Sequence, residues 1–138
     1  MTDILIMVGG SAFAILGSLH AIYTWADTRT PRRLVPDAPS VIEAMSSSFV
    51  RLSRGGTTMW RAWVGFNFSH GLGAVMFGIG CIVLGLSLRS VVLPKAVLLV
   101  PVVIGCLYLW IAIRYWFRIP VIGIAAATAC FVTAWVMY

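Results

Sequence analysis

The chain has 138 residues, of which 61% are hydrophobic and only 10% are charged, and its formal net charge is +6. A water-soluble domain covers its surface with about 25% charged residues, so this composition excludes a soluble domain and indicates a surface that faces lipid. The basic excess then indicates orientation across a membrane, and nucleic-acid binding is not expected.

Four segments are apolar over a length that can cross a bilayer: about 4–25, 60–88, 91–114 and 119–138. About 20 apolar residues cross the roughly 30 Å hydrocarbon layer. Asp3 is the only charged residue before the first apolar run. Because a basic N-terminal region is missing, this run is predicted to be a retained span and not a cleaved signal peptide. We expect an all-α membrane protein, a single domain folded as an antiparallel four-helix transmembrane bundle.

The first span is rich in small residues, which let helix backbones approach each other closely in lipid. Gly10, Phe13, Gly17 and His20 follow helical spacing along one stripe, and Thr24 lies one turn further on. This stripe predicts a face that packs on another span.

The connection at about 26–59 begins with an irregular segment that contains three prolines. Ser40 followed by Glu43 then predicts a capping box at the start of a helix, and Gly55–Gly56 predicts its end. The expected apolar stripe consists of Ile42, Met45, Phe49 and Leu52. We expect an amphipathic helix at the cytoplasmic membrane interface; a helix packed on a soluble surface is the alternative.

The second span is expected to open at Thr57 or Thr58, both of which can cap a helix. Further along, Gly65, Ser69 and Gly73 form a row of small residues four apart, which predicts a second close-packing edge.

Proline marks each of the last two spans. Pro101 lies inside the third span and predicts a kink, whereas Pro120 lies in the first turn of the fourth, where a missing N–H costs little. Between these spans, "WIAIRYWFRIP" mixes arginine with aromatic residues, as helix ends at lipid headgroups do.

Basic residues are unevenly divided between the connections. The second connection holds Arg89 and Lys95, and the first and third hold Arg29, Arg32, Arg33, Arg51, Arg54, Arg61, Arg114 and Arg118. The positive-inside rule places these eight in the cytoplasm and both termini on the non-cytoplasmic side. Anionic lipids of that leaflet are expected to attract them.

Three costly polar groups lie within the first two spans: His20, Asn67 and His70. At 1.5 Å per residue, His20 and His70 lie about 7 and 10 Å from the same membrane face, so the two side chains can meet. An unpartnered polar group in hydrocarbon costs about 2–7 kcal/mol. The three side chains are therefore expected to face the bundle interior or a wet cavity.

Three interpretations of these groups stay open. They can be interhelical hydrogen-bonding groups, a pocket for the polar head of a lipid- or quinone-like molecule, or ligands of haem or another metal through His20 and His70. The candidate ligand-binding residues are His20, Tyr23, Arg61, Asn67, Ser69, His70, Arg114 and Arg118. Asp27 is the only carboxylate near His20 in sequence.

Catalytic motifs are missing from the chain. No carboxylate falls inside a span, and no Ser-His-Asp set, HExxH, P-loop or GxGxxG pattern occurs. The cysteines Cys81, Cys106 and Cys130 lie on three different spans and are predicted to be buried small hydrophobes. No resident cofactor is predicted, with haem and quinone kept as alternatives.

Three runs carry a family resemblance: "GSLHAIYTW", "TTMWRAWVGFNFSHGLGA" and "RYWFRIPVIGI". Together they resemble an uncharacterised family of small bacterial four-span membrane proteins. The resemblance covers nearly the whole chain and implies a multi-pass protein of the bacterial cytoplasmic (inner) membrane, without implying an activity. A likeness to small oxygenase-like and sterol-isomerase-like membrane proteins rests on architecture alone, and it keeps an enzyme as an alternative.

These observations favour a non-catalytic accessory or interaction subunit. We expect its glycine-rich faces to pack against other membrane proteins or against further copies of the chain, with membrane lipids as the remaining partners. Binding or modification of a lipid- or quinone-like molecule at His20, Asn67 and His70 is the alternative function.

Overall fold

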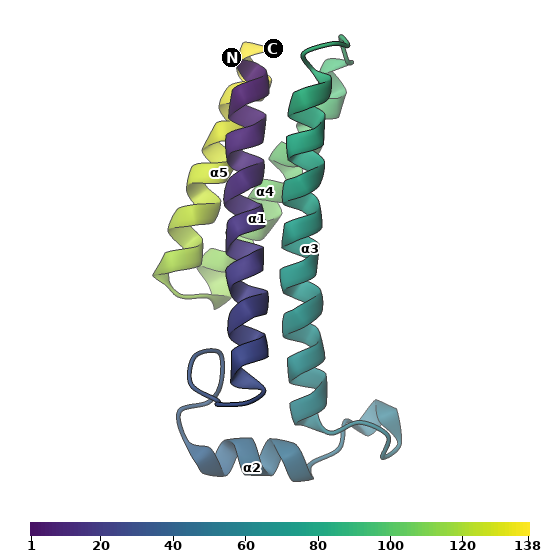
Figure 1. Ribbon diagram of the computed structural model, residues 1–138, viewed down its shortest axis with the longest axis vertical. Coiled ribbons are helices and arrows are strands. Elements are labelled where there is room, and N and C mark those ends of the chain that lie inside the picture. Colours follow the sequence, from purple (N-terminus) through teal and green to yellow (C-terminus); the bar gives the residue numbers. More distant parts are fainter. The chain divides into compact units, whose positions relative to one another are not determined.

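The computed structural model describes residues 1–138 and is entirely helical (Figure 1). The elements in order are α1 (Thr2–Asp27), α2 (Pro39–Ser47), a 3-10 turn η1 (Arg51–Ser53), α3 (Met59–Ser87), α4 (Lys95–Tyr115) and α5 (Arg118–Met137). Helices α1, α3, α4 and α5 are each long and apolar enough to cross a membrane. The prediction of an all-α, multi-pass membrane bundle is confirmed.

The chain divides into two compact units, which we describe separately. Unit 1 comprises Met1–Leu16 and Ala74–Tyr138, and unit 2 comprises Gly17–Gly73. Unit 1 therefore contains parts of all four long helices, whereas unit 2 contains the rest of α1 and α3 together with α2 and the first connection.

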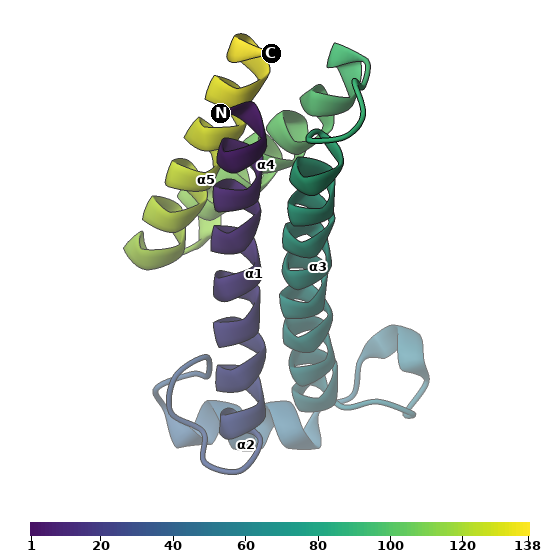
Figure 2. The ribbon, with the colours of Figure 1, turned by 45° about the horizontal axis from the view of Figure 1, so that its top comes forward.

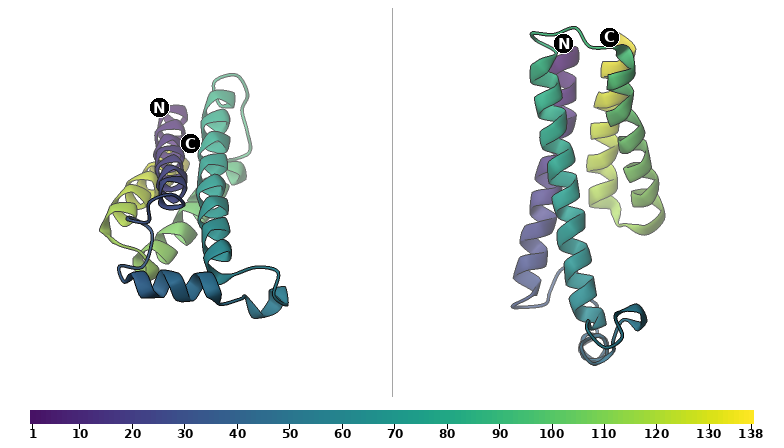
Figure 3. Two further views of the ribbon diagram at one scale, coloured as in Figure 1. Left: turned by 60° about the horizontal axis from the view of Figure 1, so that its bottom comes forward. Right: turned by 90° about the vertical axis from the view of Figure 1, so that its right-hand side faces the viewer.

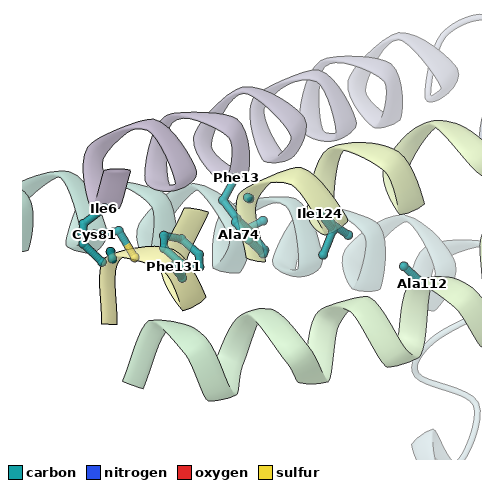
Figure 4. Packing of buried hydrophobic residues seen from close by; sticks show 9 residues of the cluster. Ile6, Phe13, Ala74, Cys81, Ala112, Ile124 and Phe131 are labelled. Atoms are coloured by element: carbon teal, nitrogen blue, oxygen red, sulfur yellow. The ribbon is translucent and has the colours of Figure 1, made fainter. Parts of the chain in front are cut away.

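The core of unit 1 is built around Phe13 of α1 (Figure 4). Its ring meets Phe77 of α3 edge-on at a centroid distance of 4.8 Å and Tyr108 of α4 at 5.4 Å, and stacks near Phe131 of α5 at 6.1 Å. Phe13 and Phe131 are almost completely buried. One side chain from each helix thus joins the bundle, and aromatic pairs of this kind prefer edge-to-face or offset geometry.

Helices α1 and α3 run antiparallel and meet at backbone distance through glycine. A Cβ added to Gly78 would lie 2.5 Å from Gly10 O, and one added to Gly85 would lie 2.8 Å from Asp3 O. Within unit 2, a Cβ on Gly71 would lie 3.1 Å from Gly17 O. The contact glycines of α3 thus recur every seven residues, the spacing of a coiled-coil seam.

This glycine seam corrects one prediction. The row Gly65, Ser69 and Gly73 was expected to pack closely, but all three residues are exposed, and a Cβ on Gly65 would meet nothing within 4 Å. At 100° per residue, this row lies on the side of α3 that faces away from Gly71. The spacing of four does place these residues on one face of the helix, but this face packs against no other part of the chain.

Helices α4 and α5 form a second antiparallel pair in unit 1 (Figure 3). Gly105 of α4 lets Thr128 and Phe131 of α5 approach, and the Tyr138 hydroxyl donates to Leu93 O at 2.7 Å. Helix α4 continues through Pro101, which is buried. Both termini of the chain lie at one end of this unit (Figure 2).

The helix cap predicted for α3 is confirmed, whereas the cap predicted for α2 is not. The Arg61 N–H donates to Thr58 Oγ1 at 3.3 Å, so Thr58 caps α3 as predicted. Helix α2 lies across the ends of α1 and α3 (Figures 1 and 3). It starts after Ala38, which makes no side-chain cap, so the capping box at Ser40 and Glu43 is wrong.

The predicted end of α2 at Gly55–Gly56 is also wrong, because the helix stops at Ser47. Ser46 and Ser47 turn their hydroxyls onto carbonyls of the preceding turn, a competing bond that weakens helices. Phe49 and Leu52 therefore leave the helix and are exposed.

Candidate functional site

The three polar residues of the first two spans come together in unit 2, and we call His20, Asn67 and His70 the polar cluster. His20 Nε2 lies 3.0 Å from Asn67 Oδ1, and the rings of His20 and His70 meet edge-on with centroids 5.2 Å apart. The expectation that the two histidines can meet is confirmed. Phe66, one turn before His70 on α3, stacks beside its ring at 6.2 Å.

Asn67 is the centre of this cluster and is only 4% exposed. Its Nδ2 donates to Trp63 O at 2.8 Å, and its Oδ1 accepts a hydrogen bond from the Nε2–H group of His20. The carboxamide thus bonds to a residue of α1 through its oxygen and to its own helix, α3, through its nitrogen. The neighbouring Thr24 hydroxyl donates to His20 O at 2.8 Å. Asn67 faces the helix partner as predicted, and both imidazoles are half-buried.

Haem ligation would demand a different arrangement of the two imidazoles. Two axial histidines hold an iron between them, whereas here the edge of one ring faces the other at 5.2 Å. A haem site at this position would therefore require the rings to separate and His20 to release Asn67. No group of three or more His, Cys, Asp or Glu side chains is placed to hold a metal ion.

The nearby carboxylate of Asp27 has a structural partner set of its own. It is the last residue of α1, is 3% exposed, and accepts backbone N–H groups from Arg32, Arg33 and Leu34 at 2.7–3.3 Å. A negative charge at a helix C-terminus opposes the helix dipole, and three N–H donors offset this cost. Asp27 thereby fixes the turn that follows α1.

Trp63 extends this turn toward α3. Its indole Nε1 donates to Leu34 O at 3.0 Å, and its backbone carbonyl accepts a hydrogen bond from Asn67 Nδ2. Trp63 therefore contacts both the first connection and the polar cluster. Neither role, for Trp63 or for Asp27, was predicted from the sequence. An acidic residue at the end of an apolar span, just before a proline-containing connection, was the available signal.

The other predicted site residues do not join the polar cluster through any hydrogen bond. Tyr23 is exposed beneath the guanidinium of Arg33, at 4.8 Å, and the Ser69 hydroxyl donates to Phe66 O within its own helix. Arg61 is exposed near the start of α3. Arg114 and Arg118 belong to unit 1, where the Arg114 guanidinium lies 5.4 Å from the Tyr115 ring.

The cysteines occupy different environments. Cys81 is buried in unit 1, Cys130 is partly buried and Cys106 is exposed, and all three are free. The prediction that all are buried is therefore wrong for Cys106.

Comparison with known proteins adds no relatives: no protein-family model matches the chain, and no curated protein or solved structure matches it.

Proposed function

We propose that the protein is a non-catalytic membrane subunit that associates with another membrane protein through the free face of α3. One observation carries the proposal. Helix α3 bears small residues on two faces, and only one of them is used within the chain.

The free face consists of Gly65, Ser69 and Gly73 of unit 2, which we call the small-residue stripe. All three are exposed, and a Cβ added to Gly65 would meet nothing within 4 Å. In lipid, helices associate through close backbone approach at small residues, because apolar side chains gain little by leaving lipid tails. The approach of Gly71 to Gly17 O within the same unit is an example of such packing on this helix. The occupant we propose is a transmembrane helix of a partner protein.

The test measures association through this stripe. Purified in mild detergent, the wild-type chain is expected to run as a larger particle, and G65L/G73L is expected to run as a monomer. A matched control, A126L/A129L, adds comparable bulk at exposed positions of α5 and is expected to leave the particle unchanged. A second copy as the partner would give a homo-oligomer with the same sensitivity. A wild-type particle that is already a monomer, or equal behaviour of both variants, refutes the proposal.

A second candidate function is supported by the half-buried imidazoles of the polar cluster. Part of each ring reaches the surface of unit 2, beside the exposed aromatic side chain of Phe66. An imidazole N–H can donate to the carbonyl of a quinone or to a lipid head while the tail lies along α1 or α3. Native mass spectrometry tests this: a bound lipid, quinone or pigment lost in H70A supports it, and its absence from wild type excludes it.

We also propose the orientation and location of the protein. The arginine-rich connections are proposed to face the cytoplasm by the positive-inside rule, which puts both termini outside. The sequence resemblance supports the bacterial cytoplasmic membrane. Accessibility of a thiol-specific reagent to E43C and S90C in intact cells tests this orientation, since only S90C is expected to react before lysis.

A further inference from the structure

The segment Ser48–Met59, which we call the hairpin loop, has a defined shape although it contains only one short turn. Phe49 and Thr58 face each other as an antiparallel bridge, and the Met59 N–H donates to Ser48 O at 2.8 Å. The Ser53 hydroxyl makes three hydrogen bonds inside the loop. The side chains at its tip are therefore presented by a closed backbone.

The tip of the hairpin loop presents apolar side chains without cover. Leu52 is 93% exposed and Phe49 is 57% exposed. Both lie in a connection that also holds polar and charged residues, at the end of membrane helices. Apolar side chains in this setting gain by entering the boundary between headgroups and acyl chains.

Uncommitted positive charge flanks these apolar side chains. Arg51 and Arg54 lie on either side of Leu52, and Arg61 follows in the first turn of α3. None of these guanidinium groups is in an ion pair or a side-chain hydrogen bond, since the ion pairs of the chain are those of Asp3. By contrast, two arginines of the segment that follows α1, Arg29 and Arg33, lie over aromatic rings.

We propose that the hairpin loop binds anionic phospholipids, with Leu52 and Phe49 in the acyl boundary and Arg51 and Arg54 on the lipid phosphate. The planar guanidinium group matches phosphate oxygens in a bidentate way. A headgroup with net negative charge, such as phosphatidylglycerol, complements the two arginines, whereas zwitterionic phosphatidylcholine does not. This inference is independent of the proposed association through α3.

The experiment titrates the full-length protein in neutral detergent with phosphatidylglycerol or phosphatidylcholine and counts bound lipids by native mass spectrometry. Wild type is expected to bind the first phosphatidylglycerol more tightly. Each arginine near a lipid surface contributes about fivefold in affinity, so R51Q/R54Q is expected to raise the Kd for phosphatidylglycerol by about tenfold or more and to leave phosphatidylcholine unchanged.

A matched variant distinguishes a specific lipid site in the hairpin loop from general attraction of the lipid to positive charge. R29Q/R33Q removes the same charge from the same unit, but at guanidinium groups that lie over aromatic rings, and it is expected to raise the Kd for phosphatidylglycerol clearly less than R51Q/R54Q does. L52S, at a side chain with no packing role, is expected to weaken phosphatidylglycerol binding while glycerol phosphate, which has no acyl chain, fails to compete. Equal loss in both arginine variants, an unchanged Kd in R51Q/R54Q, or competition by glycerol phosphate overturns the proposal. Circular dichroism and gel filtration confirm that each variant is folded.

Discussion

Substitution of Gly78 by alanine tests whether α1 and α3 are held together by backbone contact. The added Cβ would lie 2.5 Å from Gly10 O and 2.6 Å from Ala14 N. Ordinary contact begins at 3.4 Å, so the helices must separate by about 0.9 Å at this point. A gap of that size forfeits about a quarter to a half of the attraction between the facing atoms.

We expect G78A to lower the free energy of unfolding by about 1–3 kcal/mol, the usual cost of overpacking. The matched control is Gly80, two residues away on the same helix, where an added Cβ meets nothing within 4 Å. G80A is expected to be neutral or to stabilise by up to about 1 kcal/mol, because alanine favours the helix. SDS titration of the monomer in mixed micelles, followed by circular dichroism, measures both variants.

An intermediate site makes the reasoning quantitative. At Gly71 the nearest atoms to an added Cβ are Gly17 O at 3.1 Å and Ala21 N at 3.2 Å, so a shift of a few tenths of an ångström suffices. G71A is expected to destabilise less than G78A. Should G78A prove as stable as G80A, backbone contact would not be what limits the α1–α3 distance.

Three further predictions concern the polar cluster and the turn after α1. N67L is expected to cost about 1–3 kcal/mol in SDS titration because His20 loses its partner, and H20L/N67L is expected to cost less than the two single changes together; additive costs would contradict a direct bond. D27A is expected to speed tryptic cleavage at Arg32 and Arg33 in detergent, since their N–H groups lose the carboxylate, and unchanged cleavage would argue against that role. W63F removes the indole N–H that donates to Leu34 O and is expected to destabilise by about 0.5–1.5 kcal/mol; a variant as stable as wild type would contradict a stabilising role for this bond.

The long helices were predictable because lipid imposes one simple requirement on each of them. A run of about 20 apolar residues satisfies it whatever its neighbours are, and the helices begin and end within a few residues of the predicted spans. The meeting of His20 and His70 was predictable for a related reason, since polar groups in hydrocarbon must face each other or a wet cavity.

The packing face of α3 could not be chosen from spacing alone. Gly65, Ser69 and Gly73 recur at a spacing of four, whereas Gly71 and Gly78 recur at seven, and both patterns mark a helical face. Only the shape of the partner, here the small residues around Gly10, decides between them.

The end of α2 and the hairpin loop escaped prediction for a different reason. A short helix outside the hydrocarbon is marginal, so local competition decides where it ends. The hydroxyls of Ser46 and Ser47 bond to carbonyls of α2 near its end. Arg54 adopts a left-handed conformation, with φ of 49°, in the hairpin loop. Hydrophobic spacing predicts neither of these local features.

Chain order determines when the seam between α1 and α3 forms. During synthesis α1 is made before α3, so Gly10 is uncovered and the bond from His20 to Asn67 is missing until the connection between the two helices has been translated. An imidazole that lacks this bond is costly in hydrocarbon. We therefore expect α1 to remain beside the insertion machinery until α3 is made, and slower translation of the connection should lengthen that interval.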